Sequence, residues 1–93
     1  MAMDLIVSET GKVLIASDEA FAEEISRVEF FADARLLVLG FEDPESDNRL
    51  LGIEIDPKMM APLAKAGRVT IIHFDKDAKP ISGFDVPLVR IGV

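Results

Sequence analysis

The sequence predicts an α+β fold: a small single domain, residues 1–93, with a mainly antiparallel sheet of six or seven short strands and two short helices. Three observations predict it. Short apolar runs of strand composition follow one another along the chain. Tight turns separate most of them, and strands joined by a tight turn pair antiparallel. Two segments, near residues 18–26 and 57–66, begin with residues that favour a helix start.

The first two apolar runs, residues 5–8 and 12–17, predict a β-hairpin. Gly11 lies between them, and glycine supplies the positive φ that many short hairpin loops require. Residues 17–19 (SDE) then have the composition of a helix N-terminus, with acids where the helix dipole favours them. In the predicted helix, Glu23 faces outward.

The stretch after the first helix predicts a second hairpin. Helical spacing also allows the helix to continue to Ala32, but residues 28–31 (VEFF) and 36–41 (LLVLGF) are rich in residues that favour strands. Asp33 favours a turn between them. The run 36–41 is apolar on both alternating faces, so we expect it in the interior of the sheet.

The second half of the chain predicts further strands around a helix. Residues 49–55 alternate as a strand does, and Asp56 followed by proline is a good helix start. The helix is expected to end at Gly67, and Pro62 is expected to kink or divide it. Residues 69–74 (VTIIHF) are the next predicted strand.

The last predicted strand is VPLVRIGV, residues 86–93. Proline has no amide hydrogen and is therefore confined largely to edge strands, strand starts and bulges. Pro87 thus predicts that this strand lies at an edge of the sheet or enters it there.

Composition excludes several classes of function. The chain has no cysteine, which excludes disulfides, thiolate zinc sites and a cysteine nucleophile, and suits the cytoplasm. A net charge of −7 disfavours nucleic acids and anionic membranes as partners. No apolar run approaches the ~20 residues that span a bilayer. The first residues lack a basic segment and a long apolar one, so we expect no signal peptide.

His73 is the only histidine, and it lies two residues before Asp75 at a predicted strand end. Ser82 is the nearest serine along the chain, but its surroundings (PISGFD) are not a nucleophile elbow. A lone histidine in this position is typical of a surface or half-buried residue that bonds to its neighbours. We therefore assign no catalytic residue.

Motifs for metals and cofactors fail on inspection of the spacing. Residues 75–86 and 43–54 each match part of a calcium loop, but the first has proline at the glycine position and the second lies between predicted strands rather than helices. SETGKV, residues 8–13, lacks the first glycine and the final Ser or Thr of a phosphate-binding loop. We expect no metal and no cofactor.

The segment KMMAPLAKAG, residues 58–67, predicts a recognition surface. Its paired methionines, beside proline and small residues, form an adaptable apolar surface. Packing of these methionines into the core is the alternative. The predicted partner-binding residues are Met59, Met60, Leu63, Lys58 and Lys65.

The function predicted from these residues is a small acidic interaction or assembly module, not an enzyme, which binds a protein partner as a homodimer. Two short helices cannot cover both faces of a sheet whose inner strands are apolar on both sides, and a second copy is the commonest cover. A regulatory or small-ligand domain with an apolar pocket between sheet and helix is the alternative. An enzyme that uses carboxylates with His73 is the third class.

The isolation of His73 leads to a testable prediction. Replacing it in a His73→Gln variant should change the free energy of unfolding by less than about 1.5 kcal/mol. Chemical denaturation of both proteins measures this difference. An unfolded variant would contradict the prediction.

Overall fold

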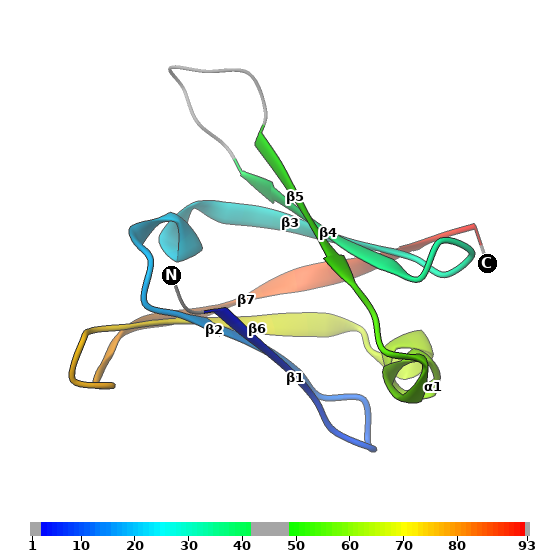
Figure 1. Cartoon of the computed structure of the whole chain (residues 1–93), viewed down its shortest axis with the longest axis horizontal. Coiled ribbons are helices and arrows are strands. Elements are labelled where there is room, and N and C mark those ends of the chain that lie inside the picture. The colour runs from blue at the N-terminus through cyan, green and yellow to red at the C-terminus, as the bar shows by residue number, and fades with distance from the viewer. Residues whose placement is uncertain (1–2, 42–48, 93) are drawn as a thin grey trace.

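A computed structural model describes residues 3–41 and 49–92 of the chain. Seven strands form one curled sheet in the order β1-β2-β6-β7-β3-β4-β5 (Figure 1). Their bounds are Met3–Val7 for β1, Val13–Ser17 for β2, Ile25–Phe31 for β3, Leu36–Phe41 for β4, Arg49–Glu54 for β5, Arg68–Phe74 for β6 and Pro80–Ile91 for β7. The edges of the sheet are thus β1 and β5.

The long strand β7 joins the two halves of the sheet. Its residues 80–87 pair antiparallel with β6, and its residues 88–91 pair parallel with β3. The half that contains β1, β2 and β6 forms one layer, and the half that contains β3, β4 and β5 forms the other (Figure 1). The core lies between these two layers.

The prediction of a mainly antiparallel sheet is wrong, because the sheet is mixed. The pairs β2–β6 and β3–β7 are parallel, whereas β1–β2, β3–β4, β4–β5 and β6–β7 are antiparallel. All four antiparallel pairs join strands that are consecutive in the chain, which is the part that turn chemistry can predict. Both parallel pairs join strands that are distant in sequence, and no local signal specifies their direction.

The predicted helix near residues 18–26 is also wrong. Only a short 3₁₀ segment, η1 (Ala20–Glu24), forms there, and β3 begins at Ile25. The Ser17 hydroxyl accepts a hydrogen bond of 3.1 Å from the Glu19 amide, but no side chain caps the first turn of η1. Ile25 is 2% exposed and packs in the core as the first residue of β3, so it cannot also belong to a longer helix.

One helical segment remains in the part of the chain that the structure describes. It consists of η2 (Pro57–Met59) and α1 (Met60–Lys65), and the Asp56 side chain caps it by accepting a 2.9 Å hydrogen bond from the Lys58 amide. The segment changes from 3₁₀ to α-helix after Met59, and Pro62 lies within α1 without interrupting it. It is the third residue of that helix, where a backbone amide would have no α-helical partner to bond.

Pro87 does not place the last strand at an edge, since β7 lies between β6 and β3. The Leu88 amide donates to the Gly67 carbonyl on the β6 side, so the preceding residue faces the other side. There the pairing with β3 begins only at Leu88. The missing amide of Pro87 therefore falls where β7 changes partners, and no ladder bond is lost.

Different elements close the two open ends of the core. At one end Leu63 of α1 is fully buried. At the other end Ala22 of η1 is fully buried, and the rings of Phe21 and Phe41 meet edge to face at 5.6 Å. Between these ends the largest buried side chains are those of Ile15, Val28, Phe30, Leu37, Leu39, Val69 and Ile71.

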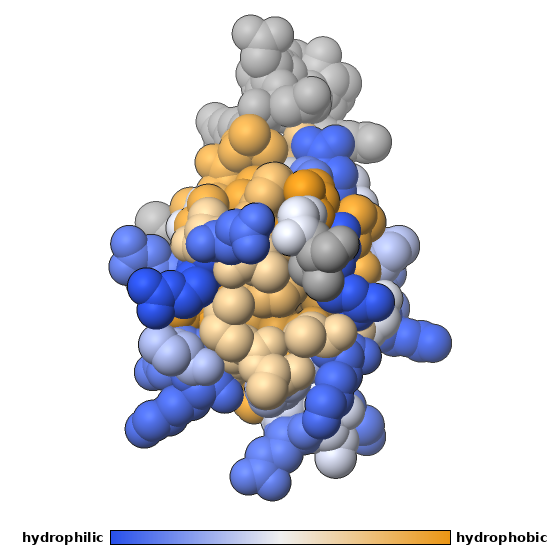
Figure 2. Space-filling model, turned by 90° about the vertical axis from the view of Figure 1, so that its right-hand side faces the viewer, coloured by the Kyte–Doolittle hydropathy of each residue, from blue (hydrophilic) through white to orange (hydrophobic). Residues whose placement is uncertain are grey.

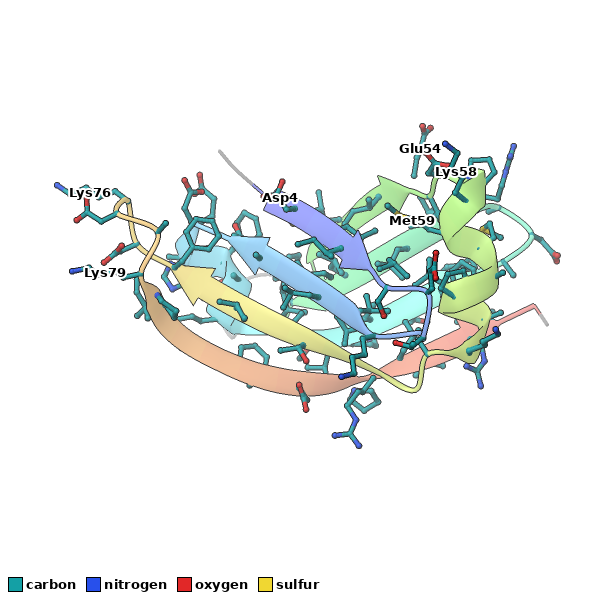
Figure 3. All side chains as sticks on the ribbon, turned by 90° about the horizontal axis from the view of Figure 1, so that it is seen from below. Asp4, Glu54, Lys58, Met59, Lys76 and Lys79 are labelled. Carbon is teal, nitrogen blue, oxygen red and sulfur yellow. The ribbon has the colours of Figure 1, made fainter. Side chains whose placement is uncertain are left out.

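The outer faces of the two layers carry no helix within the described residues, as the view from below shows for β1, β2, β6 and β7 (Figure 3). Four large apolar side chains are exposed: Ile6 at 53%, Leu50 at 63%, Ile81 at 55% and Val89 at 46%. Among the described helices, none has the length and apolar character needed to cross a lipid bilayer.

The packing of α1 predicts the effect of removing its buried side chain. A Leu63→Ala variant should lose about 2–5 kcal/mol of the free energy of unfolding, because truncation leaves a cavity at a fully buried site. Urea denaturation measures the loss. The control is Ile81→Ala, whose exposed side chain should contribute less than about 0.5 kcal/mol. Equal effects would contradict this account of the core.

Candidate functional site

Strand pairing brings several polar side chains to one end of the core. His73 on β6 is opposite Ser82 on β7 and Ser17 on β2. The alternation of β6 puts His73 on the same inner face as Val69 and Ile71. The segment η1 covers this end and supplies Glu23, which completes the cluster of His73, Glu23 and Ser82.

A single carboxylate oxygen joins the other two residues of the cluster. The Ser82 hydroxyl donates a 2.9 Å hydrogen bond to Glu23 Oε1, and His73 Nδ1 lies 3.2 Å from the same oxygen. His73 Nδ1 has no hydrogen bond of good geometry to the described residues. The His73 contact is therefore a close charge contact when the ring is protonated, rather than a well-aligned hydrogen bond.

His73 is more deeply placed than the sequence predicts, since only 8% of the residue is exposed. Sequence reasoning noticed Ser82 but missed Glu23, which is 59 residues away from that serine along the chain. The sequence analysis placed Glu23 on the outward face of a helix near residues 18–26 that the structure does not contain. In the structure η1 is short, and it places Glu23 over the end of the sheet.

The cluster lowers the pKa of Glu23 below its ordinary value of 4.5. The contact with His73 is the largest cause, and the hydrogen bond from Ser82 is the second. Both partners stabilise the ionised carboxylate, so the charge on Glu23 helps to hold η1 against β6 and β7.

The order of these groups differs from that of a nucleophilic relay. In a Ser-His-acid triad the imidazole lies between hydroxyl and carboxylate and takes the hydroxyl proton. Here the carboxylate lies between Ser82 and His73. A carboxylate whose pKa is lowered is a weak base for a serine proton. The arrangement is suited to holding η1 in place.

In the acidic turn after β6, the carboxylate of Asp75 accepts hydrogen bonds from amides of the same turn. Asp75 Oδ1 accepts hydrogen bonds of 2.9 Å from the amides of Asp77 and Lys79. This confirms the interpretation of residues 69–80 as a strand followed by a turn. Within residues 3–41 and 49–92, no group of three or more acidic or histidine side chains could hold a metal ion. The first half of the other partial calcium match, residues 43–48 of 43–54, lies outside the described residues.

The predicted partner-binding residues lie at the α1 end of the molecule, but not all on its surface. Leu63 is fully buried, and Met59 and Met60 are partly buried against the core. Lys58 and Lys65 are exposed. Figure 2 shows this end with moderately hydrophobic side chains at its centre and hydrophilic ones around them. The predicted binding role of these residues stays a prediction.

A groove of about 650 Å³ lies near this end, on the outer face of β1, β2 and β6. Its position differs from that of the pocket between sheet and helix that the sequence suggested as an alternative. Apolar and basic side chains share its lining, which consists of Ile6, Ser8, Gly11, Lys12, Val13, Leu14, Gly67, Arg68 and Thr70.

Searches with family models, against curated proteins and against solved structures found no match to this chain. The geometry of the chain is therefore the basis of every functional statement that follows.

The lowered pKa of Glu23 predicts a pH-dependent contribution to stability. Around and below pH 4.5 the unfolded chain binds the proton more readily than the folded chain, so the contribution is present above this pH and is lost as the pH falls through the folded pKa. A Glu23→Gln variant should therefore have a lower Tm than the unaltered protein at about pH 6, and this difference should shrink towards about pH 3.

Thermal unfolding monitored by circular dichroism across this pH range measures the difference. Glu24→Gln is the matched control, because it removes a charge from the exposed neighbour. A Tm difference for Glu23→Gln that is independent of pH, or equal to that for Glu24→Gln, would contradict the role of the cluster.

Proposed function

We propose that this chain is a small interaction module without catalytic activity, which forms a homodimer and binds a protein partner. The observation that carries the proposal is the outer surface of the curled sheet, where no described helix covers the strands (Figures 1 and 3) and four large apolar side chains are exposed. The absence of cysteine supports a cytoplasmic location as part of the same proposal.

The outer face of β3, β4 and β5 is the surface we assign to self-association. Leu50 and Val89 are exposed on it. Their strand register places Val38 of β4 between them on this face. The apolar positions on this face thus belong to β7, β4 and β5, and Glu29 of β3 lies in the row between Val89 and Val38.

Two features make this face suitable for contact with a flat partner surface. Arg27 lies across Gly40, since its Nε is 2.9 Å from where a Cβ atom at Gly40 would be. Arg27 Nε is also paired with Glu29 Oε1 at 3.1 Å, so these two charges largely neutralise each other. On the outer faces of β4 and β5, the charged side chain among the described positions is that of Glu54, which is exposed.

Apolar burial and charge repulsion oppose each other in a homodimer. Burial of one large apolar side chain contributes about 1.5–3 kcal/mol. A net charge of −7 on each copy opposes approach, but at physiological ionic strength charges farther apart than about 8 Å are largely screened. Because few of the acids lie on the β3–β5 face, burial is expected to dominate.

Catalysis is less well supported than binding. Enzyme sites usually combine a concave pocket with several converging polar groups. His73 of the polar cluster is buried at one end of the core, whereas the groove lies on an outer face near α1. The two features needed for catalysis are thus separated in this molecule.

The proposal predicts a dimer in solution. Light scattering at micromolar concentration and moderate salt should give a mass of about twice the chain mass of 10.2 kDa. A Leu50→Lys/Val89→Lys double variant should be monomeric, because each copy would place two charges in the apolar contact. Ile81→Lys removes an exposed apolar side chain from the other layer and should leave the dimer intact.

A sharp species with the mass of one chain, unchanged over a roughly hundredfold range of concentration, would overturn self-association. Loss of the dimer in the Ile81→Lys control but not in the double variant would show that the interface lies on the other layer.

A further inference from the structure

The groove on the outer face of β1, β2 and β6 has an apolar floor. Strand register places Ile6, Leu14 and Thr70 in one row across these three strands. Ile6 is 53% exposed and Leu14 is partly exposed, so both offer apolar surface to the groove. The volume of about 650 Å³ is within the range of ligand sites, which is about 300–1,000 Å³.

Basic side chains line one end of this floor. Lys12 and Arg68 are both exposed and line the groove. The only ion pair of Arg68 to the described residues is a long one of 3.4 Å to Asp85, and a Thr70 hydroxyl bond of 2.7 Å occupies the other oxygen of that carboxylate. The β1–β2 turn beside the groove also contains one acid, Glu9. Two cations thus converge on the groove of a chain whose net charge is −7.

The wall of the groove is preorganised. Within the β1–β2 turn, the Ser8 amide donates to the Lys12 carbonyl at 2.9 Å, and the Lys12 amide donates to the Ser8 hydroxyl at 3.0 Å. Gly11, with a φ of +88°, packs against α1: a Cβ atom there would be 3.3 Å from the Pro62 carbonyl oxygen. The turn that carries Lys12 is therefore fixed by its own bonds and by the helix.

We propose that this groove binds a peptide segment of a protein partner in which carboxylates lie to one side of a large apolar side chain. The inference rests on the proposed binding function and specifies the partner's chemistry. The apolar side chain lies on Ile6 and Leu14, and the carboxylates bind Lys12 and Arg68. An arginine presents a planar fork of donors that matches a carboxylate. Charge complementarity selects an acidic segment and disfavours a basic one.

A direct test uses fluorescence anisotropy with a labelled peptide that has Leu and Phe flanked by Asp and Glu on both sides. A second peptide with Lys in place of each acid is the specificity control. The acidic peptide should bind, the basic one should not, and the affinity should fall as salt is raised because the contact is charged.

Charge reversal in the protein locates the site. A Lys12→Glu/Arg68→Glu double variant should weaken binding of the acidic peptide at least tenfold. Lys76→Glu/Lys79→Glu changes the net charge by the same amount, but these lysines lie in the β6–β7 turn at the end opposite α1 (Figure 3). That control should bind the peptide nearly as well as the unaltered protein.

A second pair of variants tests the shape of the groove without changing charge. A Cβ atom at Gly67 meets nothing within 4 Å, so Gly67→Leu extends a side chain into open space at the groove. Gly83→Leu is the matched control on the same layer, since a Cβ atom there makes only ordinary contacts of 3.7 and 3.8 Å. Gly67→Leu should weaken peptide binding, and Gly83→Leu should not.

Several results would overturn the proposal. These are absence of acidic-peptide binding, equal binding of the basic peptide, equal loss in both charge-reversal variants, or tight binding of a long-chain carboxylate in place of the peptide. Loss of the dimer in Lys12→Glu/Arg68→Glu would also overturn it, because the groove would then be occupied by a second copy. Light scattering of the same samples separates these outcomes: an intact dimer without peptide binding refutes the groove alone.

Discussion

The change of partner along β7 is the constraint on which the rest of this structure depends. One strand pairs antiparallel with β6 and then parallel with β3, so a single segment joins two layers and curls the sheet around its core. Pro87 lies at the change, where its missing amide costs no ladder bond. Because β7 occupies the centre, β1 and β5 become the edges, and each layer has one face on the core and one face outward.

The curled sheet leaves two open ends, and the chain closes them with different chemistry. At the α1 end an apolar side chain, Leu63, fills the opening and leaves basic residues such as Lys65 on the surface. At the other end η1 is held by Glu23, whose carboxylate bonds to Ser82 and contacts His73. The only histidine of the chain is therefore part of how the core is closed, and the groove with its two cations lies on the α1 side.

In this short chain, the strands of the curled sheet carry more apolar surface than the core between the two layers buries. The outer rows contain Ile6 and Leu14 on one layer and Val38 and Leu50 on the other. These two outer faces differ in charge. Lys12 and Arg68 adjoin the first, whereas Arg27 on the second is neutralised by Glu29. The two binding roles that we propose, one charged and one apolar, rest on this difference.

Local features could be predicted from the sequence: the hairpins, the interior position of β4, the cap at Asp56 and the turn at Asp75. Turn residues, alternation and capping act between neighbours in the chain, so each of these features has a local signal. Only the tertiary structure decided the parallel pairs, the loss of the first helix and the place of Glu23 beside His73. Each of these depends on contacts between segments far apart in sequence, whose energy comes from burying shared apolar surface and carries no local signal.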